Sequence, residues 1–143
     1  MARADFGFSH TVRVRYAEID AQAVVFNSRY LEYADVAVTE YWRAAGLHGV
    51  GAAWQALEFH VGRALVEYKA PIRYDEQIDL CTRTTRIGRS SLTTFIEIHG
   101  AEMRPIDDLR ATIEIVNVNV DLATGKSRRL PGWVEAMLSH FDA

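Results

Sequence analysis

The sequence lacks several features that are typical of particular classes of protein, and each absence argues against one such class. Cys81 is the single cysteine among 143 residues, so the chain can form no internal disulfide and has no Cys-x-x-Cys motif. It lies in the alternating stretch "QIDLCTRTTRIG", which favours a packed strand thiol over a nucleophile. The net charge is −3, so no excess of Lys and Arg exists to hold a phosphate backbone. The composition therefore predicts no nucleic-acid partner.

Long apolar runs are also missing. No stretch approaches the roughly 20 apolar residues that span a bilayer, and "MARADFGFSH" lacks the apolar core of a signal peptide. We expect no membrane association and a cytoplasmic location. No Gly-x-Ser-x-Gly elbow and no His, Cys and Asp cluster with metal-ligand spacing is present, which argues against a serine hydrolase and against a metal site.

The pattern of apolar residues predicts one domain over residues 1–143, because 49% hydrophobic residues suffice for a core and no linker interrupts them. Residues 8–16 alternate as a half-buried strand, and apolar residues then recur at helical spacing as far as Ala45, before Gly46. From residue 59 the period becomes two. The expected later elements are strands within 60–71, 76–88, 90–101 and 109–122, a short strand after the turn "DLATGK", and a helix in "PGWVEAMLSHF".

Short connections between successive strands require antiparallel pairing. The expected fold is therefore α+β, an antiparallel sheet that wraps one long helix over about residues 28–45, since this helix is apolar on most of its sides.

The stretch "YAEIDAQAVVFNSRY" raises the question of function. Asp20 precedes an apolar run, and Asn27 and Ser28 then offer two equally good starts for the long helix. Asp20 stands too far from the helix to be a simple cap. It is either a turn-forming residue or a reactive carboxylate that faces the helix end if the loop doubles back.

The motif "Y-x-E-x-D", followed by an apolar stretch and "NSRYLEYAD", resembles the hotdog-fold acyl-CoA thioesterases of the 4-hydroxybenzoyl-CoA thioesterase type. "VEYKAPIRYDEQIDLCTRTTRIGRSS" resembles the second and third strands of that family, and the likeness spans about residues 8–122. The resemblance implies hydrolysis of an acyl- or aroyl-CoA thioester, with Asp20 as general base or nucleophile. It places the oxyanion-binding backbone N–H at or near Asn27, whose side chain is a second catalytic candidate. Relatives commonly carry a turn former and a glycine where this chain has Ala21 and Ala23.

The resemblance also implies a binding site for coenzyme A, which is part of the substrate, so no separate cofactor is expected. The candidate substrate-binding residues are Phe26, Tyr30, Gly88, Arg89, Ser90 and Ser91, the last four forming the hairpin "GRSS". For these four, a plain tight hairpin is the alternative interpretation. An unpaired edge strand and the resemblance together predict a homodimer or homotetramer with sites between subunits.

Other acidic and histidine residues receive structural interpretations. Glu18 is expected to be exposed at a strand end, and Glu32 or Asp35 is a reserve catalytic group, because some hotdog thioesterases carry their carboxylate on the long helix. His60 and His99 are expected in the core or at an edge, since neither has a paired acid at triad spacing. Two other functions stay open: a hotdog hydratase or dehydratase, disfavoured because no His lies between positions 10 and 48, and a non-catalytic module that binds acyl thioesters.

Overall fold

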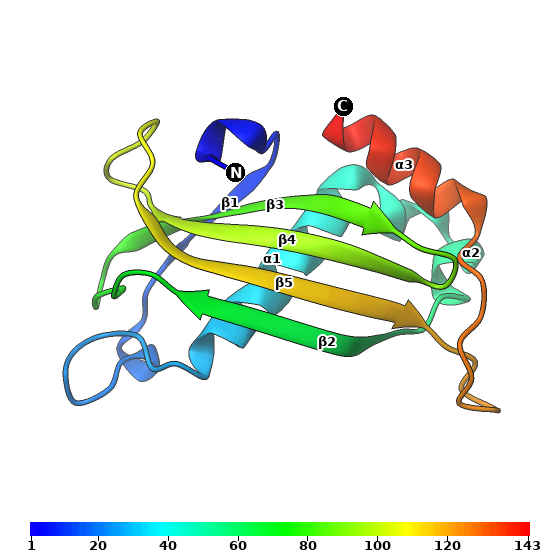
Figure 1. Ribbon diagram of the computed structural model, residues 1–143, viewed down its shortest axis with the longest axis horizontal. Helices are drawn as coiled ribbons and strands as arrows, with labels where there is room; N and C mark the ends of the chain where they lie inside the picture. The colour runs from blue at the N-terminus through cyan, green and yellow to red at the C-terminus, as the bar shows by residue number, and fades with distance from the viewer.

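The computed structural model describes residues 1–143 and contains one five-stranded sheet that packs its inner face against a long helix (Figure 1). The strands lie in the order β1-β3-β4-β5-β2, and every neighbouring pair is antiparallel. The helices and strands are β1 (Ser9–Arg13), α1 (Arg29–Ala45), α2 (Ala52–Gln55), β2 (Phe59–Tyr68), β3 (Gln77–Ile87), β4 (Ser91–Gly100), β5 (Leu109–Asn119) and α3 (Gly132–Asp142). The predicted arrangement of one long helix with an antiparallel sheet is confirmed.

Two of the expected strands differ from the structure. The first ends at Arg13, because the chain turns into a short 3-10 helix at Tyr16–Glu18 instead of continuing to residue 16. The last, expected after the turn at 121–126, is a single bridge between Val120 and Ser127. In both places local turns interrupt the alternation before a full strand can form.

Helix α1 ends where the sequence predicts. Gly46 adopts the left-handed conformation, with φ of 90°, and its N–H donates to the carbonyl oxygen of Arg43 at 3.0 Å. Glycine takes this conformation without the steric cost of a Cβ atom. The chain then turns through Leu47–Val50 and α2 before entering β2.

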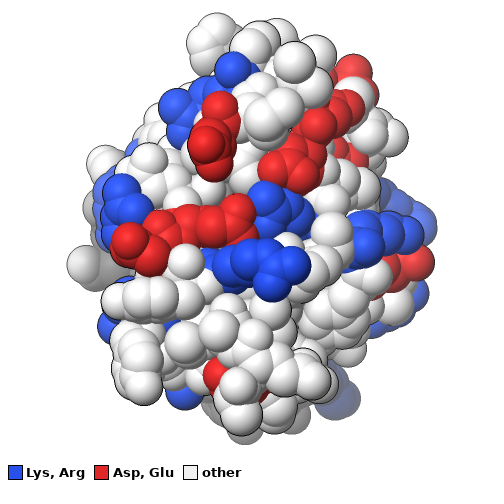
Figure 2. Space-filling model, turned by 90° about the vertical axis from the view of Figure 1, so that its left-hand side faces the viewer, with Lys and Arg blue, Asp and Glu red and all other residues white.

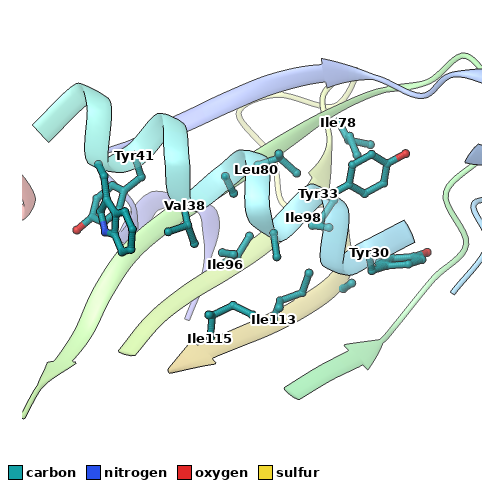
Figure 3. Close-up of a cluster of buried hydrophobic side chains, with 14 of the residues drawn as sticks. Tyr30, Tyr33, Val38, Tyr41, Ile78, Leu80, Ile96, Ile98, Ile113 and Ile115 are labelled. Atoms are coloured by element: carbon teal, nitrogen blue, oxygen red, sulfur yellow. The ribbon is translucent and has the colours of Figure 1, made fainter. Parts of the chain in front are cut away.

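The core lies between α1 and the inner face of the sheet (Figure 3). The helix contributes residues of one broad face, and the strands contribute alternate residues, as a period of two requires. Burial of each such side chain contributes about 1.5–3 kcal/mol to folding. The buried residues at this contact include Tyr30, Tyr33, Val38, Tyr41, Ile78, Leu80, Ile96, Ile98, Ile113 and Ile115.

The outer face of the sheet holds a buried polar cluster. His99 is buried and its Nε2 lies 2.9 Å from Glu97 Oε1, while its Nδ1 accepts the N–H of Asp108 at 3.0 Å. The prediction that His99 is a buried or edge histidine is confirmed, and its acidic neighbour Glu97 lies two residues away on the same strand rather than at the spacing of a catalytic triad. Residues two apart on a strand share a face, so Glu97 and His99 meet directly. His60 is exposed on β2, 3.3 Å from Glu58.

Cys81 lies in the same layer, opposite Glu97 in the register of β3 and β4. It is buried, and burial raises the pKa of its thiol to about 11. A thiol that stays protonated at neutral pH is a poor nucleophile. The expectation of a packed strand thiol is confirmed.

Strand β2 forms an open edge of the sheet. It pairs with β5 on one side and with nothing on the other, and it exposes large apolar side chains, including 62% of Val61. Leu65 and Tyr68 on the same strand are also exposed. Unpaired edge strands with apolar side chains are templates for pairing with another chain.

Charged side chains of both signs are interspersed on the end of the molecule that carries the loops between strands (Figure 2). Arg110 pairs there with Glu76 and Asp108, each at 2.8 Å, and Arg104 pairs with Asp79 at 2.7 Å. No basic field covers this face. No helix is long and apolar enough to cross a bilayer.

Candidate active site

The stretch around Asp20 folds into a tight loop that doubles back beside the start of α1 (Figure 1). The N–H of Asp20 donates to the carbonyl of Val24 at 2.9 Å, and the N–H of Phe26 donates to the carbonyl of Glu18 at 2.9 Å. Ile19 and Val25 form an antiparallel bridge between these two hydrogen bonds. The return of the loop, on which the proximity of Asp20 to the helix depends, is therefore present.

Ala23 closes this loop in an unusual conformation. Its φ is 62°, in the left-handed region, at the position where the family that the sequence resembles commonly carries glycine. Alanine in this region costs about 1–2 kcal/mol, because its Cβ approaches a carbonyl oxygen. The hydrogen bonds on either side of the turn hold the loop closed in spite of this cost.

We expect Ala23→Gly to raise the free energy of unfolding by about 1 kcal/mol, since glycine removes the strain at positive φ. Urea titration followed by tryptophan fluorescence measures this change. Ala21→Gly is the matched control in the same turn, because Ala21 does not have a positive φ. It should lower stability slightly, and a gain at both positions would contradict the strain at Ala23.

The carboxylate of Asp20 makes one hydrogen bond within this loop. Its Oδ1 accepts the N–H of Gln22 at 2.8 Å, and the side chain is partly exposed. This contact is the turn-forming role that the sequence left open for Asp20. The hydrogen bond uses only Oδ1 of Asp20, so Oδ2 has no hydrogen-bond partner in the loop.

The start of α1 presents two backbone N–H groups without acceptors. Ser28 is the N-cap of the helix, and neither it nor Asn27 forms a side-chain cap. The N–H of Arg29 donates to Phe26, whereas the N–H groups of Asn27 and Ser28 donate to no protein atom. Free N–H groups and the positive end of the helix dipole together favour an oxygen that carries negative charge.

A hollow of about 280 Å³ lies beside this helix start. Asn27, Tyr30 and Tyr68 line it, together with Val24 and Lys69. The hydroxyl of Tyr68 donates to the carbonyl of Asn27 at 3.0 Å, and the rings of Tyr30 and Tyr68 meet edge to face at 4.8 Å. Strand β2 is thereby fixed to the beginning of α1, and Tyr30 is buried at the wall of the hollow.

Glu18 holds the loop to α1 and was not recognised from the sequence. The expectation that it is exposed is wrong: it is 6% exposed, and its Oε1 accepts the hydroxyl of Tyr33 at 2.8 Å and the N–H of Arg15 at 2.8 Å. Burial acts to raise the pKa of Glu18, but hydrogen bonds from Arg15 and Tyr33 outweigh it and keep this pKa below its ordinary value. Burial and the same hydrogen bond raise the pKa of the Tyr33 hydroxyl.

When folding lowers the pKa of a carboxyl group, its ionised form stabilises the folded protein at pH values above the ordinary pKa of the group. This stabilisation disappears as the pH falls through the pKa that the group has in the folded state. We expect Glu18→Gln to lower the free energy of unfolding at pH 7 by about 1.5–3 kcal/mol, as for hydrogen bonds to a charged group. The difference from wild type should shrink below pH 4.5, the ordinary pKa of the group. Urea titrations over a pH series measure it.

Glu32→Gln is the matched control for Glu18. Glu32 also pairs with an arginine three residues away, Arg29 at 2.8 Å, but on the exposed surface of α1. Exposed ion pairs contribute little, about 0–1 kcal/mol. An equal, pH-independent loss in both variants would contradict the buried role of Glu18. The reserve candidates Glu32 and Asp35 are both exposed.

The other substrate-binding candidates are not all close to Asp20 in one chain. Phe26 is exposed on the returning arm of the loop, whereas Gly88, Arg89, Ser90 and Ser91 form the hairpin between β3 and β4 at the opposite end of the sheet. Ser91 pairs with Val118, while Tyr68 pairs with Ala111 on the same strand β5. Val118 and Ala111 are seven residues apart along β5, which corresponds to about 23 Å.

The hairpin itself is firmly held. The N–H of Gly88 donates to the carbonyl of Ser91 at 2.7 Å, and the carbonyls of Arg89 and Ser90 accept N–H groups of Leu130 and Asn119. Arg89 of this hairpin is exposed. It can therefore contact a substrate only in a site that extends to this end of a subunit. No group of three or more His, Cys, Asp and Glu residues in the structure could hold a metal ion.

Most of the chain matches a known protein family. A family model described as "Thioesterase-like superfamily" matches residues 14–138, which include the loop, α1 and all four long strands. The chain belongs to the thioesterase-like superfamily. The resemblance proposed from the motif around Asp20 is thereby confirmed.

Individual relatives agree with this assignment. The chain is 31% identical over 124 residues to "Acyl-CoA thioester hydrolase YbgC" of Escherichia coli O6:H1, covering 87% of this chain and 90% of the relative. A crystal structure of a protein from Pseudomonas aeruginosa PAO1 superposes with a TM-score of 0.83 at 20% identity, covering 98% of this chain and 94% of the other. A thioesterase from Thermus thermophilus, complexed with coenzyme A and Zn, has a TM-score of 0.78 at 24% identity, covering 96% of both chains. These likenesses confirm the hotdog fold.

Proposed function

We propose that this thioesterase-superfamily chain hydrolyses acyl-CoA thioesters to a free acid and CoA, at the junction between the Asp20 loop and the start of α1. The observation that carries the proposal is the pair of free N–H groups at Asn27 and Ser28, beside a loop that carries a carboxylate. The names of relatives point to the same reaction: the Escherichia coli protein is described as an acyl-CoA thioester hydrolase, and the Thermus protein binds coenzyme A.

In this mechanism the thioester oxygen accepts the N–H groups of Asn27 and Ser28. Negative charge develops on that oxygen as the carbonyl carbon is attacked, and pre-oriented donors stabilise it by a few kcal/mol. Asp20 acts as general base on a water molecule or attacks the carbonyl carbon itself. With Asp20 as general base, the C–S bond breaks after water has added, and the proton that Asp20 took from this water passes to the departing thiolate of CoA. With Asp20 as nucleophile, breaking of the C–S bond leaves a mixed anhydride on Asp20, which water hydrolyses to the free acid, and the thiolate takes up a proton from solvent. The side chain of Asn27 lies at the same place and can orient the water or the thioester.

The acyl-CoA would lie across two subunits. If the open edges of two β2 strands pair antiparallel about a two-fold axis, each chain's Asp20 end meets its partner's hairpin end. The partner subunit's Gly88, Arg89, Ser90 and Ser91 then complete the site, with the partner subunit's Arg89 available for a CoA phosphate. Such a pairing explains why one chain holds these residues about 23 Å from Asn27. We propose a homodimer of this kind, which a second interface extends to a homotetramer.

Phe26 and Tyr30 would contact the substrate near its carbonyl, since both flank the helix start. The reaction needs no cofactor besides the CoA that the substrate carries. A cytoplasmic location fits a reaction on CoA thioesters.

A panel of acetyl-, butyryl-, dodecanoyl- and benzoyl-CoA, with free thiol detected by a chromogenic reagent, tests the function. We expect thiol release above the spontaneous rate from at least one thioester, with an equal amount of free acid. With crotonyl-CoA in the same assay, a loss of the enoyl absorbance without thiol release would instead indicate a hydratase or dehydratase. Tight binding of thioesters without any reaction would indicate a binding module.

A further inference from the structure

The two free N–H groups at the start of α1 belong to two successive peptide groups. The N–H of Asn27 shares a planar peptide with the carbonyl of Phe26, and the N–H of Ser28 shares one with the carbonyl of Asn27. Both carbonyls accept hydrogen bonds, whereas both N–H groups donate to no protein atom. The proposed oxyanion donors are therefore held from their carbonyl ends.

Different groups hold the two carbonyls. The carbonyl of Phe26 accepts the N–H of Arg29 at 2.9 Å, a hydrogen bond between neighbouring parts of the backbone. The carbonyl of Asn27 accepts the hydroxyl of Tyr68 at 3.0 Å, and its backbone partner, the N–H of Tyr30, is more distant at 3.4 Å. Hydrogen bonds weaken with such lengthening. The main hydrogen bond to this second peptide therefore comes from a side chain of β2.

A hydrogen bond to a peptide carbonyl also changes the N–H of the same peptide. It draws electron density toward the oxygen and makes the N–H a stronger donor, by about 10–30% in chains of such bonds. It further fixes the plane of the peptide, so the direction of the N–H is set before a substrate binds. Through the carbonyl of Asn27, Tyr68 thus acts on both the strength and the direction of the N–H of Ser28.

Tyr68 is itself firmly placed. It is the last residue of β2, and the N–H groups of the next two residues, Lys69 and Ala70, donate to the carbonyl of Arg110 at 2.8 and 3.0 Å. Its ring meets that of Tyr30 edge to face, with centroids 4.8 Å apart, and Tyr30 is buried. Figure 3 shows Tyr30 at the helix start, with its hydroxyl directed away from the core. The phenol of Tyr68 therefore has a rigid support on both its backbone and its ring.

The hydroxyl of Tyr68 contributes little to folding and cannot itself hold the thioester oxygen. A phenol has one proton to donate, and here the carbonyl of Asn27 accepts it. The side chain is 53% exposed, so water can replace this hydrogen bond in the unfolded and the folded protein alike. A role in orienting the peptide accounts for the bond better than a role in stability.

We propose that Tyr68 is a positioning residue, which orients and polarises the peptide between Asn27 and Ser28 so that its N–H binds a thioester oxygen. The proposal rests on the proposed thioester hydrolysis, because that reaction places the oxygen at this helix start. Since Tyr68 ends the open edge strand β2, the geometry of the site depends on this strand as well as on the Asp20 loop.

Tyr68→Phe tests the proposal, because it keeps the ring on Tyr30 and removes only the hydroxyl. Loss of a complete oxyanion donor costs about 10²–10³-fold, so we expect this weaker change to slow hydrolysis of bound thioester about tenfold in a single turnover. The affinity for the thioester, from the concentration dependence of that rate, should change by less than about twofold. A purely structural hydrogen bond would instead lower the midpoint of thermal unfolding and leave this rate unchanged.

Tyr74→Phe is the matched control. Tyr74 is 49% exposed, and its N–H donates to the carbonyl of Ala23 at 3.3 Å, so it too lies beside the Asp20 loop. Its ring packs on Tyr16, with centroids 5.8 Å apart, rather than on the helix start. This variant should keep the rate and the affinity of wild type.

Fluorotyrosine at position 68, with one ring fluorine beside the hydroxyl, separates polarisation from shape. The fluorine withdraws electron density and makes the hydroxyl a stronger donor, while the ring keeps its packing. We expect the single-turnover rate at pH 7 to rise above that of wild type. An unchanged or lower rate would overturn the proposed polarisation.

A ketone analogue of dodecanoyl-CoA, with a methylene group in place of sulfur, separates this proposal from the proposed function, because it binds without being hydrolysed. Polarisation by N–H donors moves the NMR resonance of its labelled carbonyl carbon downfield. The shift on binding should be smaller in Tyr68→Phe than in wild type or Tyr74→Phe. This result in a wild type that hydrolyses no thioester would support the role of Tyr68 while the hydrolytic function fails. Equal shifts in wild type and Tyr68→Phe would overturn the proposal, whatever the activity.

Discussion

Asp20→Asn is expected to lower kcat/KM for acyl-CoA hydrolysis by about 10²–10⁴-fold, the usual effect of losing a general base. Asparagine cannot take a proton from water and is a poor nucleophile. Its Oδ1 can still accept the N–H of Gln22, so the turn at the tip of the loop should persist. We expect the free energy of unfolding to change by less than about 0.5 kcal/mol, as for substitutions that keep local contacts. Steady-state thiol release and urea titration measure the two quantities.

Asp121→Asn is the control for this prediction. Asp121 forms the same kind of turn, its Oδ1 accepting the N–H of Ala123 at 2.9 Å, but it lies in the segment after β5. This variant should retain the activity of wild type. Full activity in Asp20→Asn would show that Asp20 is a turn-forming residue, and Glu32→Gln and Asp35→Asn would then identify a carboxylate on α1.

Lysine at both Val61 and Leu65 is expected to separate the subunits and to lower kcat/KM by more than about 100-fold. In a pair of β2 edges, the two new charges on each strand would lie close to those on the other, which opposes pairing. The loss of activity follows because a monomer keeps its hairpin at 88–91 far from Asn27. Light scattering combined with size-exclusion chromatography gives the mass, and thiol release gives the activity.

Leu122 and Ile106 allow a matched control, since both are as exposed as Val61 but lie in loops away from β2. Lysine at these two positions should change neither mass nor activity. Val61 also lines a pocket between α1 and β2, so the dependence of activity on protein concentration is the deciding measurement. Activity per chain of the edge variant should rise with concentration as dimers re-form. A fully active monomer at all concentrations would contradict a shared site.

The sequence predicts the fold well wherever one period dominates. The apolar spacing of residues 30–45 and the glycine that follows identify α1, and the alternation after residue 59 identifies four strands. The buried environment of Cys81 also follows from its place in an alternating stretch. These features depend on local pattern and burial, which a single sequence carries.

The site is predicted less completely, because its contacts join distant residues. The burial of Glu18 depends on Tyr33, fifteen positions later, and no periodicity signals this pair. The positive φ of Ala23 is stabilised by hydrogen bonds across the loop rather than by its own preference.

A single-turnover experiment tests the central claim most directly, because it separates binding of a thioester from its hydrolysis. Enzyme in excess is mixed with labelled acyl-CoA, quenched at intervals, and analysed for thioester, free acid and CoA. Wild type should convert all bound thioester to equal amounts of acid and CoA, whereas Asp20→Asn should retain intact thioester at least about 100 times longer. Conversion by Asp20→Asn at the rate of wild type, or no conversion of bound thioester by wild type, would contradict the account.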